Sequence, residues 1–410
     1  MSEKIQIGIL TFHRSINYGA FMQCYALCNR IKRDFPQADV EVIDYVSKMV
    51  YDRYKPSVLS YIIGPKGKRN SLKESAKRMA KSILFPKQIR SQKERYNAFQ
   101  SVMNVLPLSK EKLISDDVKL FYETYRGKYD VVIIGSDAVW EFLNYPFPNV
   151  YFMHDKIANH IISYAASCDR MHINTINNAQ REYIKEGLLN FKYLGVRDVS
   201  TESFVGNICS AARLFHNCDP TALLDLNSFS EHKELAREKL ITYGIDLRKP
   251  MIGIMGGRLI CKFAKEIFGK THQIISLYDY NPDADFSVTN LTPLEWANVF
   301  SFFDLTFTRY FHGFWLSVIN GVSPIVIDDW FMIDDKHDSK LLDLAKRLDL
   351  LDHYFRLADL SNKKEEITAL ARRLVNADES DLLFKKVSQE ANTYQSFKTS
   401  LNSILDNYKK

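Results

Sequence analysis

Arginine, histidine, aspartate and glycine residues gather at six places along the chain. Arginine forms paired hydrogen bonds to phosphate and carboxylate groups, and histidine exchanges protons near neutral pH. Glycine lets the backbone turn sharply or approach a ligand closely. This composition is typical of a site that binds an anionic substrate and moves protons. The six clusters cover residues 13–19, 135–137, 197–198, 219–221, 255–258 and 308–313.

Each cluster follows a segment that we expect to be a β-strand. The segments 129–135, 251–255 and 324–328 are nearly continuous apolar runs, which is typical of a parallel sheet covered on both faces. Segments with helical spacing alternate with them, so the order is that of an α/β protein. A single glycine at such a turn often serves only backbone geometry. Six clusters at strand ends favour a ligand site, because open α/β sheets bind ligands at the carboxyl ends of their strands.

Two consecutive α/β sets of similar size predict two domains. We place an N-terminal Rossmann-like domain at 1–230 and a C-terminal one at 231–410, the latter ending in helices. The fold class expected is therefore α/β, with two doubly wound domains facing a cleft. A basic helical insert, residues 48–105, interrupts the first domain.

The insert carries most of the positive charge. Residues 48–95 hold fourteen Lys or Arg and three Asp or Glu, a net of +11 within a chain whose total is +6. Apolar residues at helical spacing over 72–83, with lysines and arginine beside them, predict a basic amphipathic helix. Either it packs on the protein with a solvated basic face, or residues 66–95 contact anionic lipid or a phosphate-bearing acceptor. Because the charge is local, we do not expect nucleic-acid binding.

Composition narrows the class of protein further. The chain has 410 residues, 46% hydrophobic and 25% charged, which excludes disorder as its main state. No apolar run approaches the roughly 18 residues needed to span a bilayer, and the first residues lack a signal-peptide pattern, so we expect a cytoplasmic protein. The six cysteines are too few for a disulfide framework, and the histidines lack metal-ligand spacing. We expect no essential metal and no cofactor.

The clusters also occur in a familiar order. Over residues 5–330 they resemble the motif series of the polysaccharide pyruvyl transferase family. Members of that family have two domains similar to GT-B glycosyltransferases, and they use phosphoenolpyruvate to place a pyruvate ketal on a sugar of a surface polymer. The motifs that carry the resemblance are Asn17-Tyr18-Gly19-Ala20 with Gln23, Gly135-Ser136-Asp137-Ala138-Val139-Trp140, Ser163-Tyr164-Ala165-Ala166-Ser167, Arg197-Asp198, Asp219-Pro220-Thr221 and Phe311-His312-Gly313.

The resemblance implies roles for the second half of the series. Phosphoenolpyruvate carries a phosphate and a carboxylate, and Arg197 and Arg309 are the candidates to bind them, together with Arg258. Gly313 would open a helix whose free N–H groups favour the phosphate. His312 is the candidate general acid–base, with the donor on the C-terminal domain.

The first half of the series implies the acceptor side of the site. Asp137 is the candidate to orient or deprotonate a hydroxyl of the glycan or lipid-linked oligosaccharide; a helix-capping role is the alternative. The remaining cleft residues that the resemblance implies are Asn17, Tyr18, Gly19, Gln23, Ser136 and Asp219.

Three positions depart from the family pattern. Ala138 stands where many members carry Gln, and Cys168-Asp169 replaces a common Phe-Gly. Arg309 is three residues before His312, whereas the family often has arginine two before. Two further functions therefore stay open: a GT-B glycosyltransferase that uses a nucleotide sugar, and a non-catalytic glycan-binding homologue.

Overall fold

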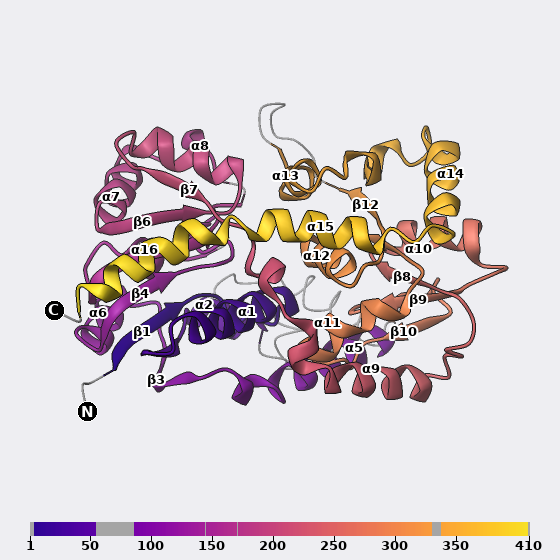
Figure 1. The fold of residues 1–410 in the computed structure, drawn as a ribbon, viewed down its shortest axis with the longest axis horizontal. Coiled ribbons are helices and arrows are strands. Elements are labelled where there is room, and N and C mark those ends of the chain that lie inside the picture. The colour runs from indigo at the N-terminus through magenta and orange to yellow at the C-terminus, as the bar shows by residue number, and fades with distance from the viewer. Residues whose placement is uncertain (1–3, 55–85, 144, 170, 330–337, 409–410) are drawn as a thin grey trace, which may run out of the picture. The chain divides into compact units, whose positions relative to one another are not determined.

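The computed structural model describes residues 4–54, 86–143, 145–169, 171–329 and 338–408 (Figure 1). Its contacts divide the chain into two compact units. Unit 1 comprises the described residues of Met1–Lys55, Asn104–Leu224 and Ala391–Lys410, and unit 2 those of Pro56–Met103 and Asp225–Glu390. The units therefore alternate along the sequence. The basic amphipathic helix predicted over 72–83 lies outside the described residues.

Unit 1 is built on a seven-stranded parallel sheet of order β3-β2-β1-β4-β5-β6-β7. Neighbouring β1 and β4 are far apart in sequence, so the strand order reverses between them. The strands are β1 (Ile5–Leu10), β2 (Ala38–Val46), β3 (Leu108–Ile114), β4 (Tyr129–Ile134), β5 (Ala158–Ala166), β6 (Phe191–Val196) and β7 (Leu214–His216).

Helices connect these strands, as the alternating pattern predicts. The C-terminal helix α16 returns to this unit and packs against β6 (Figure 1). The α-helices of unit 1 are α1 (Tyr18–Asp34), α2 (Lys48–Tyr54), α6 (Val118–Tyr125), α7 (Asn178–Leu188), α8 (Val199–Ile208) and α16 (Tyr394–Asp406).

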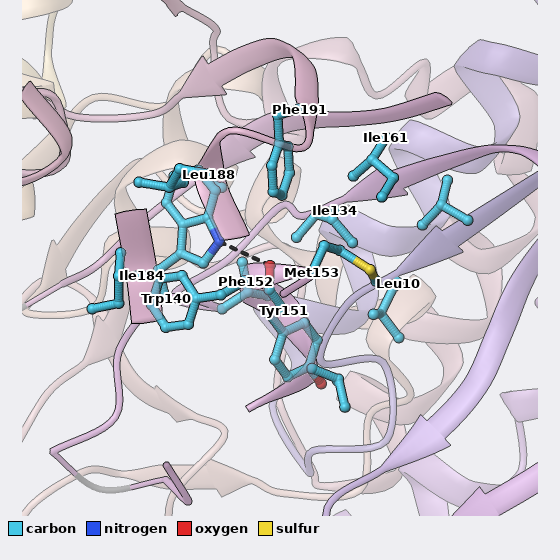
Figure 2. Close-up of a cluster of buried hydrophobic side chains, with 14 of the residues drawn as sticks. Leu10, Ile134, Trp140, Tyr151, Phe152, Met153, Ile161, Ile184, Leu188 and Phe191 are labelled. Carbon is cyan, nitrogen blue, oxygen red and sulfur yellow. Dashed lines mark hydrogen bonds between the residues drawn. The ribbon is translucent and has the colours of Figure 1, made fainter. Parts of the chain in front are cut away.

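The core of unit 1 lies between its sheet and the segment that follows β4. Trp140 is fully buried, and its indole N–H donates to the Tyr151 carbonyl at 3.1 Å (Figure 2). Its ring stacks on Phe152 with centroids 6.2 Å apart. Truncating a buried tryptophan of this kind to alanine costs about 3–5 kcal/mol, so Trp140 is a packing residue that fixes the loop after β4.

Unit 2 repeats the plan with six parallel strands in the order β10-β9-β8-β11-β12-β13. Here the order reverses between β8 and β11. The strands are β8 (Met251–Met255), β9 (Gln273–Leu277), β10 (Phe286–Val288), β11 (Leu305–Thr308), β12 (Pro324–Asp328) and β13 (Tyr354–Arg356). The α-helices are α5 (Pro86–Gln100), α9 (Glu231–Thr242), α10 (Arg258–Phe268), α11 (Pro293–Val299), α12 (Phe311–Ile319), α13 (Lys340–Arg347), α14 (Lys364–Val375) and α15 (Ser380–Ala391).

Helix α5 and helix α16 show how contacts, rather than sequence position, assign segments to the units. Helix α5 falls within the insert predicted for the first domain, yet its contacts place it in unit 2. Helix α16 lies at the end of the predicted second domain, yet it belongs to unit 1. Among the residues that the structure describes, no helix is both long enough and apolar enough to cross a membrane.

Candidate functional site

In unit 2, the predicted clusters meet where the strand order reverses. Gly256 and Gly257 follow β8, and Arg309 follows the neighbouring strand β11. The Arg309 backbone N–H donates to the Met255 carbonyl at 2.9 Å. A Cβ on Gly257 would stand 3.8 Å from the Arg309 Nη1 atom, so the guanidinium lies against the start of α10. This is the position at which doubly wound sheets bind ligands.

Two helix N-termini open at the same strand ends. Gly257 precedes α10 and Tyr310 precedes α12, and neither side chain caps its helix. The first N–H groups of a helix carry partial positive charge and favour an anion. The Arg309 guanidinium is about one-third exposed and forms an ion pair with Asp329 at 2.7 Å. The arrangement offers a cation and two sets of N–H donors to an anionic ligand.

His312 is the second residue of α12 and is half-buried. Its ring meets Phe311 edge to face, with centroids 5.3 Å apart. Gly313 follows, and a Cβ there would stand 2.3 Å from Thr308 Oγ1 and 3.3 Å from Met255 Cβ. Gly313 therefore lets α12 approach the ends of β8 and β11 closely, which is a packing reason for glycine beside the predicted phosphate-binding one.

Arg258 begins α10 on the exposed side of the helix. Its Nε donates to Asp283 Oδ2 at 2.6 Å and its Nη2 to Asp283 Oδ1 at 3.2 Å. The hydrogen bond to Arg258 lowers the pKa of the Asp283 carboxyl. Asp283 and Asp285 form an Asp-x-Asp pair, but Asp285 is bound to Lys265 at 2.7 Å. Helix α10 therefore supplies a cation to each carboxylate. Arg309 also pairs with a carboxylate, but it is less exposed than Arg258 and lies where the strand order reverses.

A network beneath Tyr310 was not predicted from the sequence. The Tyr310 hydroxyl donates to Asp279 Oδ2 at 3.0 Å, and Arg95 of α5 binds the other oxygen of Asp279. Arg95 also donates to the Tyr278 carbonyl at 3.1 Å and lies over the Tyr278 ring. Burial and the nearby Asp279 charge raise the pKa of Tyr310. The side chain just before α12 is thus held by a helix about 200 residues earlier in the chain.

In unit 1, the loops after β1 and β4 meet at the corresponding reversal of strand order. Thr11 Oγ1 donates to the Ser136 carbonyl at 2.7 Å. Gly135 has φ +109, and a Cβ there would stand 2.4 Å from the Tyr164 carbonyl oxygen, so the turn requires glycine. Asp137 is half-buried with φ +85, and its Oδ1 accepts the Ala138 N–H at 2.8 Å. A backbone held in this sparsely populated region is typical of a functional turn.

Arg197 is 2% exposed and lies in an ion-pair network of unit 1. Its Nη1 is 3.2 Å from Asp219 Oδ2, and its Nε is 3.5 Å from Asp198 Oδ2. Burial opposes the charge of Arg197, but the surrounding carboxylates, Asp219 foremost, outweigh it and raise its pKa. Thr221 binds the other oxygen of Asp219 through both its N–H and its hydroxyl. This arrangement ties Arg197 to the loops after β6 and β7, a framework role beside the predicted ligand-binding one.

Helix α1 supplies the rest of the predicted unit-1 residues. Asn17 caps the helix by accepting the Gly19 N–H at 3.0 Å and the Ala20 N–H at 3.4 Å. Tyr18 is buried, and Gln23, also buried, donates to Asp219. The structure therefore brings Gln23 and Arg197 to the same oxygen of Asp219, while Asn17 serves the helix end.

Asp44 is a residue of this rim that the sequence patterns did not reveal. It lies near the end of β2, and His13 Nε2 contacts its Oδ1 at 3.1 Å. Arg14 binds both oxygens, with Nη2 2.5 Å from Oδ2. Burial raises the pKa of the Asp44 carboxyl, but hydrogen bonds from Arg14 and His13 reverse this and leave it lowered. No motif marks Asp44, because its role depends on the pairing of β1 with β2.

Comparisons with known proteins agree with this architecture. The family model described as polysaccharide pyruvyl transferase matches residues 17–329. The structure of a UDP-N-acetylglucosamine 2-epimerase from Rickettsia bellii superposes with a TM-score of 0.52 at 8% identity, over 99% of this chain and 98% of that one. A protein assigned as the same enzyme from Listeria monocytogenes gives a TM-score of 0.50 at 9% identity, over 99% and 98% of the two chains. No curated protein matches the sequence.

At such low identity the structural likeness bears on the fold alone. It confirms the predicted class: two parallel sheets with interleaved helices, each Rossmann-like. The structural similarity does not identify a substrate for this chain.

Proposed function

The chain belongs to the polysaccharide pyruvyl transferase family, and from that premise we propose that it moves the enolpyruvyl group of phosphoenolpyruvate onto two hydroxyls of one sugar. The sugar would be part of a surface polysaccharide or a lipid-linked oligosaccharide. The observation that carries the donor assignment is the Arg309 guanidinium against the start of α10, beside the start of α12. A cation and helix N–H groups match the phosphate and carboxylate of phosphoenolpyruvate.

The proposed reaction begins with a proton transfer to carbon. His312, on the first turn of α12, delivers a proton to the methylene carbon of phosphoenolpyruvate, which becomes a methyl group and leaves a cation at C2. One sugar hydroxyl attacks C2 and gives up its proton, which replaces the proton that His312 delivered. A second hydroxyl of the same sugar then displaces the phosphate, and the proton that it loses leaves with the phosphate. The products are the cyclic pyruvate ketal and inorganic phosphate.

The chain's own residues would divide this work. Arg309 and the N–H groups near Gly313 bind and orient the donor. Arg258, the first residue of α10, assists them. Asp137 would orient or deprotonate an acceptor hydroxyl from its turn after β4. Arg197 would hold the unit-1 loops through Asp219. Phosphoenolpyruvate is the co-substrate, and the proposed chemistry requires no cofactor and no metal.

The test is a direct assay with the full chain. The protein is incubated with phosphoenolpyruvate and a panel of aryl glycosides and lipid-linked oligosaccharides, and phosphate release is measured beside the glycan mass. We expect phosphate release matched by a mass gain of one pyruvate minus one water. A parallel melting experiment should show stabilisation by phosphoenolpyruvate and none by UDP-sugars, because a ligand that binds the folded state stabilises it. Stabilisation by a UDP-sugar alone would favour the glycosyltransferase function instead.

A further inference from the structure

Unit 2 contains a polar cavity formed by residues outside the predicted site. Its volume is about 630 Å³, and its walls are the N-terminal half of α5, the end of α9 and the loops around β10. That volume lies within the roughly 300–1,000 Å³ of pockets that bind small organic ligands. Hydroxyl and amide groups dominate the walls, among them Ser91, Tyr243, Asn281 and Asn290.

Asn290 lines this cavity, and one acceptor atom of its side chain lacks a hydrogen bond. Asn290 Oδ1 is buried, and no described residue donates to it. The main-chain carbonyl of Asn290 is bound by Lys239 Nζ at 2.8 Å, which fixes the backbone at this position. A buried carbonyl oxygen without a donor is costly, and a rotation of the amide that turns Oδ1 into the cavity would let a ligand hydroxyl satisfy it.

Among the charged side chains around the cavity, one cation has no carboxylate partner in the described part of the chain. Arg90 pairs with Glu94 at 2.8 Å, and Asp285 pairs with Lys265 at 2.7 Å. Lys87 has no carboxylate within ion-pair distance among the described residues, and its ammonium lies 5.7 Å from the centre of the Tyr280 ring. The cavity therefore offers hydroxyl-binding groups, an aromatic ring and one unmatched positive charge.

The cavity adjoins the loops of the donor site. Asn281, in its wall, donates weakly to the Gly256 carbonyl at 3.5 Å. Glu94 binds Thr289 in the wall at 2.7 Å, while the next residue, Arg95, holds Asp279 under Tyr310. One stretch of α5 thus forms part of the cavity and supports the residue before α12.

We propose that this cavity binds a segment of the acceptor glycan that carries a negatively charged group, a sugar carboxylate or a sugar phosphate. Asn290 Oδ1 accepts a sugar hydroxyl, Tyr280 packs against a sugar ring, and Lys87 pairs with the charged group. The proposal rests on the proposed function for the identity of the glycan as acceptor. The binding itself needs no phosphoenolpyruvate.

The experiment is calorimetric titration of the full chain without phosphoenolpyruvate. The probes are a uronic-acid oligosaccharide, a neutral oligosaccharide of the same length and a sugar 1-phosphate. We expect the charged probes to bind more tightly than the neutral one. Lys87→Gln should weaken the charged probes about tenfold, the scale of a lost charge-assisted hydrogen bond, and leave the neutral probe unchanged. Lys93→Gln, on α5 but outside the cavity wall, is the matched control.

The variant Asn290→Ala distinguishes binding in the cavity from non-specific electrostatic attraction of the charged probes. It should weaken the charged and neutral oligosaccharides alike, by several-fold, without changing the melting temperature by more than a degree or two. The proposal is overturned if no probe binds, or if Lys87→Gln and Asn290→Ala both leave binding unchanged. Binding with no phosphate release in the transfer assay would refute the proposed function and leave the cavity assignment standing. Pyruvyl transfer without binding of any probe to the cavity would support the proposed function and refute the cavity assignment.

Discussion

The Tyr310 hydroxyl donates a hydrogen bond to Asp279 Oδ2 at 3.0 Å, and the other oxygen of Asp279 is bound by Arg95. Tyr310 lies between Arg309 and α12, so this bond fixes the orientation of the turn that presents both Arg309 and His312. Asp279 follows β9 and Arg95 belongs to α5. Asp279 is therefore a positioning residue for the proposed donor site.

Removing that hydroxyl should loosen the turn without removing a ligand-binding group. For Tyr310→Phe we expect the KM for phosphoenolpyruvate to rise about fivefold to tenfold, the scale of one hydrogen bond, with a smaller change in kcat. Steady-state kinetics at varied phosphoenolpyruvate measure both. Tyr408→Phe, which removes a hydrogen bond to the Asp130 carbonyl in unit 1, should leave KM unchanged. A loss confined to kcat in Tyr310→Phe would contradict a positioning role.

Arg309 should dominate donor binding. We expect Arg309→Lys to raise the KM for phosphoenolpyruvate at least tenfold, because an ammonium cannot form the paired contacts of a guanidinium. Arg258→Gln should have a smaller effect, since Arg258 is largely exposed and paired with Asp283. Melting curves with and without phosphoenolpyruvate give an independent measure. Arg248→Gln, an exposed arginine paired with Asp246, serves as the control. Equal effects of Arg309→Lys and Arg258→Gln would argue against this ranking.

His312 should act on the rate rather than on binding. In His312→Asn we expect turnover to fall about 100-fold or more, the usual scale for a lost general acid, with phosphoenolpyruvate affinity within several-fold of wild type. Single-turnover phosphate release and ligand-dependent melting separate the two quantities. His272→Asn, a half-buried histidine that follows α10, should retain normal turnover. Near-normal turnover in His312→Asn would exclude His312 as the general acid and leave it a structural role at the start of α12.

Arg197 should matter for stability first. Arg197→Gln removes the cation from between Asp219 and Asp198, and breaking a buried pair in this way costs about 3–5 kcal/mol. We expect urea denaturation to show a loss of that size, against less than about 0.5 kcal/mol for exposed Arg248→Gln. The fraction of Arg197→Gln that remains folded should bind phosphoenolpyruvate normally. A selective loss of donor affinity with unchanged stability would return Arg197 to the ligand-binding residues.

The basic insert yields a prediction that rests on sequence alone, since residues 66–85 lie outside the described part of the chain. If it contacts an anionic membrane surface, each Lys or Arg there contributes up to about 1 kcal/mol, screened by salt. We expect salt-sensitive binding to anionic vesicles, abolished when Lys73, Lys77, Arg78 and Lys81 are all changed to Gln. Transfer to a water-soluble glycoside should survive the change. Absence of wild-type binding at low salt would exclude the membrane contact. If the Gln variant also used a lipid-linked acceptor normally, the segment would be a solvated one.

The sequence by itself determined the α/β class, the main strands of both sheets and the strand-end positions of the six clusters. It could do so because parallel strands are apolar runs and because polar residues at their ends stand out against them. The segments of β3, β10 and β13 carry no such pattern, and the helices predicted at the end of the second domain are α14, α15 and α16. Strands at or near a sheet edge are short or partly polar, so their patterns are weak.

Only the tertiary structure decided which side chains meet. Arg197 looks like a ligand-binding arginine in sequence, and only the fold shows that it is buried beside Asp219. Asp44 joins His13 and Arg14 because β1 pairs with β2, and Arg95 reaches Asp279 because α5 packs in unit 2. Such contacts join residues about 20 to 180 positions apart, and their energies depend on distance and burial in the folded chain. A local sequence pattern reflects composition and periodicity. It contains neither the distance between two side chains nor their burial.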